Sequence, residues 1–240
     1  MDLYRIPKPA LKAIANLASN KKTIYSSRQP IEFCKISGGF MFAMTASVVL
    51  KVPIEYLTEN TDDAYVHHEV LKRIVKESNG SHYVITRDHV EEIAMEHIYN
   101  VPYPDEKKFL NPWPDATIDL AGKSHDLFFD AASKRGTFIE LRTTMTGTQF
   151  RQCDAFGSAT VLDLVQDLAV KSKCSIVTGG HCYDCALVRH AKTLKFTSVN
   201  LARLNGNQCL HFTKADGSQG IVIRMQPGIS YEFIGELYKA

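Results

Sequence analysis

Two cysteines in the second half of the chain stand at the spacing of a zinc half-site. Cys182 and Cys185 are separated by two residues, His181 and His190 flank them, and Cys174 is close by. Zinc prefers thiolate and imidazole ligands, and Cys-x-x-Cys is a common half of a structural site. The sequence has no second Cys-x-x-Cys pair, so the histidines would have to complete the ligand set. Simple alternation of these residues along a strand is the alternative, and both interpretations stay open.

Acidic residues around a strand-like segment raise a second kind of chemistry. Asp115, Asp119 and Asp126 precede the segment FIELR, which contains Glu140 and Arg142. Carboxylates on a hairpin hold a hard cation in metal-dependent nucleases, where the cation activates water. Such sites usually use lysine where Arg142 stands, and arginine does not lose its proton to act as a base. Exposed acidic residues beside a strand are the alternative.

Other catalytic and targeting signals are absent from the sequence. It contains no Gly-x-Ser-x-Gly and no phosphate-cradling glycine-rich loop, and we expect no cofactor. The start of the chain, MDLYRIPKPALKAI, does not read as a signal peptide, so we expect an intracellular, cytoplasmic protein with its six cysteines reduced. We expect no membrane association. A net charge of +2 does not indicate a nucleic-acid partner by itself.

The first half of the chain predicts helices and strands in alternation. Ser37, Gly38 and Gly39 interrupt an alternating pattern and predict a tight hairpin turn. Asn79-Gly80 predicts the end of a helix. The expected helices are Pro9–Ala18 and His67–Glu77, and the expected strands are Asp2–Ile6, Ile31–Ile36, Phe40–Thr45, Val48–Leu57, His82–Thr86 and Val90–Tyr99.

The proline-rich segment Val101–Pro114 predicts a connector, and the second half then partly repeats the order of the first. Ala215-Asp216-Gly217 predicts a hairpin turn near the end. The expected helices are Lys123–Lys134 and Thr160–Val170, and the expected strands are Ala116–Leu120, Thr137–Thr143, Thr148–Cys153, Cys174–Thr178, Cys182–His190, Gln208–Thr213 and Gly220–Met225. We expect two domains, residues 1–113 and a divergent 114–240.

The order of these segments resembles the sliding-clamp family of DNA polymerase processivity factors. The resemblance lies in PALKAIANLAS as first helix, IEFCKISGGFMFAMTA as hairpin, AYVHHEVLKRIVKE as second helix and YPDEKKFLNP as connector. The ending CLHFTKADGSQGIVIRMQP is similar to the last hairpin of a clamp. The resemblance implies an α+β fold of two consecutive clamp-like domains, each with two helices packed on antiparallel sheets.

The resemblance implies a non-enzymatic ring around duplex DNA, with helices lining the hole. Encirclement needs only weak attraction to phosphates, not contacts to particular bases. A stripe of basic residues is equally typical of an ordinary solvated helix face. The residues expected to face the DNA are Lys8, Lys12, Lys72, Arg73, Lys76, Lys123, Lys134 and Arg135.

The resemblance also implies partner proteins and self-association. Family clamps bind short peptides of DNA polymerase and other replication proteins in an apolar pocket near the connector and the chain end. The matching residues here are Phe109, Leu110, Trp113, Ile223 and Met225. These residues could instead join the two domains. Two domains per chain imply a homotrimeric ring of the small phage, viral or cellular kind, whereas a metal-dependent nuclease or a zinc-binding nucleic-acid protein is the alternative function.

Overall fold

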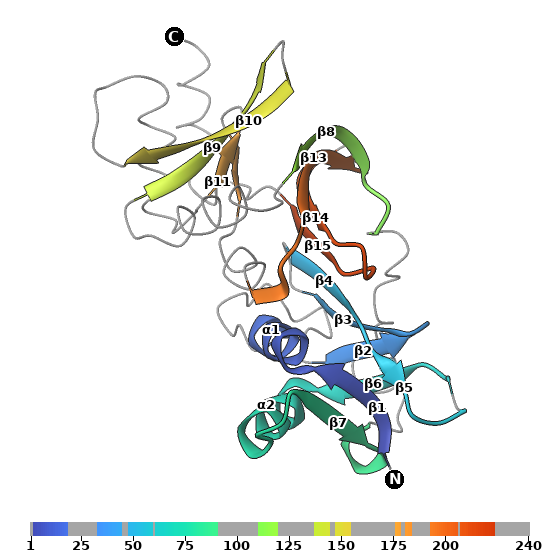
Figure 1. Ribbon diagram of the computed structural model, residues 1–240. Helices are drawn as coiled ribbons and strands as arrows, with labels where there is room; N and C mark the ends of the chain where they lie inside the picture. Colours follow the sequence, from blue (N-terminus) through green and yellow to red (C-terminus); the bar gives the residue numbers. More distant parts are fainter. Residues whose placement is uncertain are drawn as a thin grey trace, which may run out of the picture.

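The fold is taken from a computed structural model of the chain (Figure 1). It describes residues 2–18, 33–44, 48–59, 61–90, 110–119, 137–144, 147–154, 176–178, 181–183, 193–205 and 207–223, and for the strands between residues 113 and 183 it describes the backbone only.

An eight-stranded antiparallel sheet runs through both halves of the chain. Its order is β6-β2-β3-β4-β15-β14-β13-β8, so strands from the first half meet strands from the second at the β4–β15 pair. In that pair Leu50 lies opposite Gly220 and Val49 opposite Ile221. The strands are β2 (Phe33–Ser37), β3 (Phe40–Met44), β4 (Val48–Pro53), β6 (Ala64–His67), β8 (Trp113–Asp119), β13 (Ser198–Leu204), β14 (Asn207–Thr213) and β15 (Gln219–Ile223).

Two smaller sheets complete the described strands. The first has the order β5-β1-β7, with β1 (Asp2–Pro7) between β5 (Glu55–Tyr56) and β7 (His82–Thr86). The second has the order β10-β9-β11-β12, and its β9–β11 pair is parallel. Its strands are β9 (Thr137–Thr144), β10 (Gly147–Asp154), β11 (Ile176–Thr178) and β12 (His181–Tyr183).

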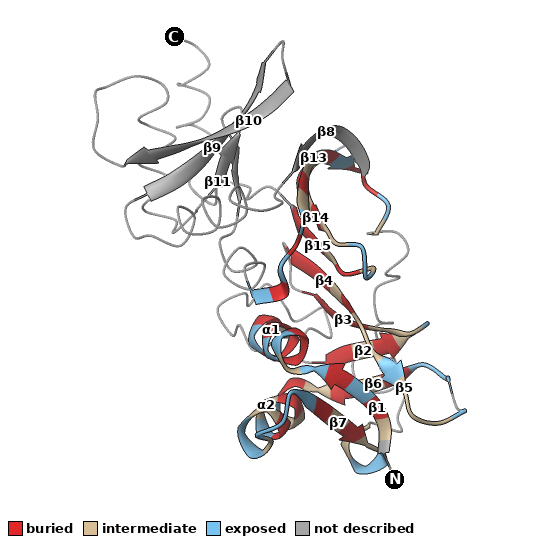
Figure 2. Cartoon of the chain, viewed as in Figure 1, coloured by how far each residue is buried: buried red, intermediate tan, exposed pale blue. Residues whose placement is uncertain are grey.

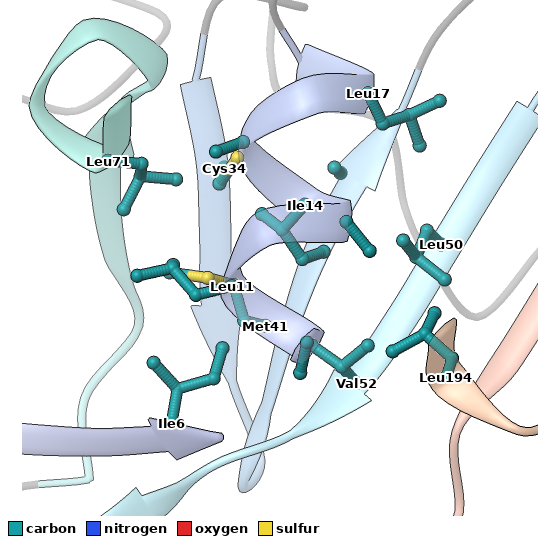
Figure 3. Close-up of a cluster of buried hydrophobic side chains, with 14 of the residues drawn as sticks. Ile6, Leu11, Ile14, Leu17, Cys34, Met41, Leu50, Val52, Leu71 and Leu194 are labelled. Carbon is teal, nitrogen blue, oxygen red and sulfur yellow. The ribbon is translucent and has the colours of Figure 1, made fainter. Parts of the chain in front are cut away.

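Helices α1 (Lys8–Ala18) and α2 (His68–Glu77) lie side by side and share one core with the strands of the first half (Figure 1). Figure 3 shows Leu11, Ile14 and Leu17 of α1 pointing into this core, beside Leu71 of α2 and Met41 of β3. The second half of the chain also contributes to this core, since Leu194 and Phe196 of segment 193–196 are buried in it. Figure 2 shows buried residues on both helices and on the strands beside them.

Both hairpin turns predicted from the sequence are confirmed. Gly38 (φ 56°) and Gly39 (φ 83°) have the positive φ angles that a two-residue turn requires. In the second turn Gly217 has φ 86°, and its N–H donates to the Lys214 carbonyl oxygen at 3.1 Å. Asp216 Oδ1 also accepts from the Ser218 N–H at 2.9 Å.

Several expectations for the first half are wrong in detail. The segment AYVH is strand β6, at the edge of the large sheet, rather than the start of a helix, and its Ala64 and Val66 are buried in the main core. Helix α2 ends at Glu77 as expected, but Ser78 already leaves the helix with φ −99° and ψ 130°, and neither Asn79 nor Gly80 has the positive φ of a helix cap. The expected strand Val48–Leu57 is divided between β4 and β5, which belong to different sheets.

In the second half, β13 was not predicted, and β8 begins at Trp113, within the expected connector. The strand expected from Cys182 begins at His181, and its described part ends at Tyr183. The expected helices Lys123–Lys134 and Thr160–Val170 and the segment 91–99 lie outside the described residues.

Candidate nucleic-acid interface

Helix α1 is buried on nearly all sides and exposes only a narrow strip. Ala10, Leu11, Ala13, Ile14, Ala15 and Leu17 are buried, whereas Pro9, Lys12 and Asn16 are exposed. The helix is buried this far because it contacts the sheets, α2 and the segment 193–196 together. Lys12 is therefore the one fully exposed charge among the described residues of this helix.

Lys8, at the start of α1, is held differently. Its side chain is half-buried, and its Nζ lies 5.9 Å from the ring centroid of Tyr83 in β7. Its backbone N–H donates to the Ser81 carbonyl oxygen at 3.0 Å. A cation above an aromatic face is partly compensated there, so Lys8 is less available to a phosphate than Lys12.

Helix α2 has one buried side and one charged side. His68, Leu71 and Ile74 are buried. The spacing of three or four residues places the exposed side chains on one face of the helix, where basic and acidic groups are mixed. They are Glu69, Arg73, Lys76 and Glu77, with Lys72 half-buried at the margin.

The charges on this face differ in their pairing. Lys72 Nζ lies 2.9 Å from Glu69 Oε1, whereas Arg73 and Lys76 form no ion pair with a described residue. The bond from Lys72 is the main reason that the pKa of the Glu69 carboxyl is below its usual value. Burial, with the Arg73 charge as the next cause, lowers the pKa of the nearby His89 imidazole.

The first turn of α2 is capped by a histidine. His67 Nδ1 accepts a hydrogen bond from the Glu69 backbone N–H at 3.3 Å, and its ring packs edge-on against Phe33 with centroids 5.0 Å apart. An N-cap acceptor satisfies a helix N–H that has no partner within the helix. The sequence did not reveal this cap, because histidine is not among the usual N-cap residues.

Sequence-predicted residues in the second half remain predictions. Lys123, Lys134 and Arg135 lie outside the described residues. For the zinc hypothesis, His181 and Cys182 lie in β12, while Cys185 and His190 are not described. For the nuclease hypothesis, Asp115 and Asp119 lie in β8 and Glu140 and Arg142 in β9, strands of two different sheets. Within the described part of the chain, no cluster of His, Cys, Asp and Glu could hold a metal ion.

Leu110 is the one predicted partner residue whose side chain is described. It is half-buried and packs on a small apolar cluster on the side of the large sheet away from α1. This cluster, here called the rear cluster, consists of Met44, Val49, Ala202, Leu204, Cys209 and Ile221. Trp113 and Ile223 occupy the start of β8 and the end of β15, and Phe109 and Met225 lie outside the described residues.

DNA polymerase III beta subunits are among the solved structures with a similar arrangement of helices and sheets. DNA polymerase III subunit beta from Borrelia burgdorferi matches with a TM-score of 0.51 and 10% identity, covering 93% of this chain and 64% of its own. Caulobacter crescentus pol III beta matches with a TM-score of 0.51 and 7% identity, covering 94% and 66%. The chain has the sliding-clamp fold. No family model matches the sequence, and no curated protein does.

The sliding-clamp fold confirms the α+β architecture expected from the order of elements. The chain spans slightly less than two thirds of the length of either clamp chain, so their activity does not transfer with the fold. Among the described residues, no helix is long and apolar enough to cross a membrane.

Proposed function

We propose that the protein is a sliding-clamp-like processivity factor that encircles duplex DNA. The observation that carries this proposal is the exposed cations of α1 and α2 within a clamp fold. Lys12, Arg73 and Lys76 are exposed and have no ion-pair partner among the described residues. Lysine and arginine side chains with this freedom can contact phosphates in succession without reading bases.

The fold supports the proposal independently of the charges. Both helices are fixed by a shared core, so their exposed residues are held at constant positions relative to one another. A rigid face with few cations suits sliding, because each phosphate contact is weak and quickly replaced. Partner proteins, namely DNA polymerase and other replication proteins, belong to the same proposal, as does assembly into a homotrimeric ring.

Retention on circular DNA tests encirclement. Wild-type protein should remain on a nicked circular plasmid and slide off the same plasmid once it is linearised. Replacing Lys12, Arg73 and Lys76 with alanine should weaken retention, and each lost phosphate contact should reduce the salt-dependence slope by about 0.9. Equal binding to circular and linear DNA would contradict encirclement.

Mass in solution tests the ring. Light scattering at micromolar concentration should give about three times the chain mass of 26.9 kDa. A monomer at all concentrations would contradict a ring built from this chain alone. The triple alanine variant is the matched control, since its exposed substitutions should leave the mass unchanged.

A further inference from the structure

One carboxylate oxygen at the start of α2 pairs with a lysine and also lies close to a buried histidine. Glu69 Oε1 lies 2.9 Å from Lys72 Nζ and 2.9 Å from His68 Nε2. The Lys72 pair has the i, i+3 spacing that brings side chains together on a helix. The carboxylate therefore bridges the buried and the charged sides of α2.

Three neighbours lie around Glu69 and differ in what they contact. The His68 side chain is only 6% exposed, so its imidazole cannot swing away from the core. The backbone of Glu69 is held by the His67 cap. Lys72 is itself partly buried, with 31% of its side chain exposed against 55% for Glu69.

The consequence is an uneven distribution of charge on the helix face. Glu69 compensates Lys72 and occupies one of its donors, whereas Arg73 and Lys76 have no such carboxylate among the described residues. A lysine in a salt bridge contributes less to phosphate binding, because the existing pair must first be broken.

We propose that Glu69 limits how tightly this face holds the DNA backbone, by keeping Lys72 in an ion pair while Arg73 and Lys76 contact phosphates. This inference rests on the proposed DNA-binding function. Glu69 is a positioning residue in this role, since it acts on the phosphate through Lys72.

Glu69→Gln tests the inference in the full-length protein on duplex DNA. Releasing Lys72 should tighten binding about two- to fivefold, a small effect because exposed pairs are weak. The slope of log K against log salt should steepen by up to about 0.9 as one more phosphate is contacted. Lys72→Ala should cost more affinity in the Glu69→Gln background than in the wild type, which a merely structural role for Glu69 would not produce.

Glu55→Gln is the matched control. Glu55 forms an exposed pair with Arg5 at 3.2 Å, and Arg5 points away from the core between the buried Tyr4 and Ile6. The substitution makes the same change in net charge and also releases a cation, but on a sheet rather than on α2. It should tighten binding less than Glu69→Gln and leave the salt slope unchanged.

The possible results separate this inference from the proposed function. Weaker binding by Arg73→Ala together with no effect of Glu69→Gln would overturn the role of Glu69 alone. An equal gain from Glu55→Gln and Glu69→Gln would overturn it too, because net charge would then explain the change. No duplex binding by the wild type or by Glu69→Gln at low salt would overturn both the role of Glu69 and the proposed function.

Titration of the Glu69 carboxyl by NMR gives a readout without DNA. Its pKa should rise in Lys72→Ala, and an unchanged pKa would overturn the pairing.

Discussion

The ring of Phe40 lies against Gly217, across the junction between the two halves of the large sheet. A β-carbon built on Gly217 would be 3.0 Å from Phe40 Cε1 and 3.2 Å from Cζ. Lys51 Nζ lies 3.8 Å from the centroid of the same ring. Phe40 therefore links β3 and β4 of the first half to the β14–β15 turn of the second.

This contact predicts that Gly217→Ala destabilises the protein for two reasons. The residue has φ 86°, which strains any side chain, and the new methyl group would meet the Phe40 ring. We expect a loss of about 2–3 kcal/mol of unfolding free energy, measured by denaturant titration. Gly38→Ala is the control, because Gly38 has φ 56° but open space around it. It should cost only about 1 kcal/mol, and equal losses at the two sites would show that the ring contact adds nothing.

Turn chemistry is what made the two hairpins predictable from the sequence. Gly-Gly and Asp-Gly act locally, so no other part of the chain is needed to foresee their positive φ angles.

Strand β13 carries no such local signal in the sequence. Val199 and Leu201 pack toward the main core, while Ala202 and Leu204 pack on the rear cluster. A strand that is apolar on both faces lacks a clean alternation.

The site was predictable in outline only. Spacing placed Lys12, Arg73 and Lys76 on exposed faces, because helical periodicity depends on sequence alone. The position of the Lys8 side chain depends on Tyr83, a partner 75 positions away along the chain. That partnership arises from the packing of α1 on β7, which no local pattern reveals.

Lys8 and Lys12 therefore should differ in their contributions to DNA binding, although they carry the same charge one turn apart. Lys12→Ala should weaken retention on circular duplex more than Lys8→Ala, since only Lys12 is fully exposed. Lys8→Ala should instead lower the melting temperature slightly, by losing its contact with the Tyr83 ring. Parallel retention assays and thermal melts of the two variants measure both effects. Equal losses of retention would place Lys8 at the DNA after all.

His211 in β14 predicts a loss of stability in mild acid. Burial lowers the pKa of its imidazole, and the Gln219 side chain opposes the shift in part. His211 lies opposite Asn200 of β13 and Ile221 of β15, neither of which carries a charge. Because the folded pKa is below the unfolded value of about 6.5, the unfolded chain binds the proton first. Stability should be complete above that pH and should fall as pH decreases through the folded pKa.

Denaturant titrations of His211→Gln at pH 7.5 and at pH 5 check this dependence. The variant should lose less stability between the two pH values than the wild type does. A wild-type pH profile that His211→Gln does not flatten would assign the acid sensitivity to other groups.

Leu110 distinguishes a joining role from a partner pocket, which the sequence left open. It packs on the rear cluster, which contains Met44 and Val49 from the first half and Ala202 and Ile221 from the second. This contact favours the joining role. Leu110→Ala should lower the unfolding free energy by about 1–2 kcal/mol, less than the 2–5 kcal/mol for a fully buried leucine, because Leu110 is half-buried.

Ile221→Ala is the reference for the change in unfolding free energy measured in Leu110→Ala. Ile221 is 0% exposed in the same cluster, so its truncation should cost about 2–5 kcal/mol. Stimulation of a DNA polymerase by each folded variant separates the two roles of Leu110. A joining residue should leave stimulation by the folded fraction intact. Unchanged stability of Leu110→Ala together with lost stimulation would instead assign Leu110 to a pocket that receives partner peptides.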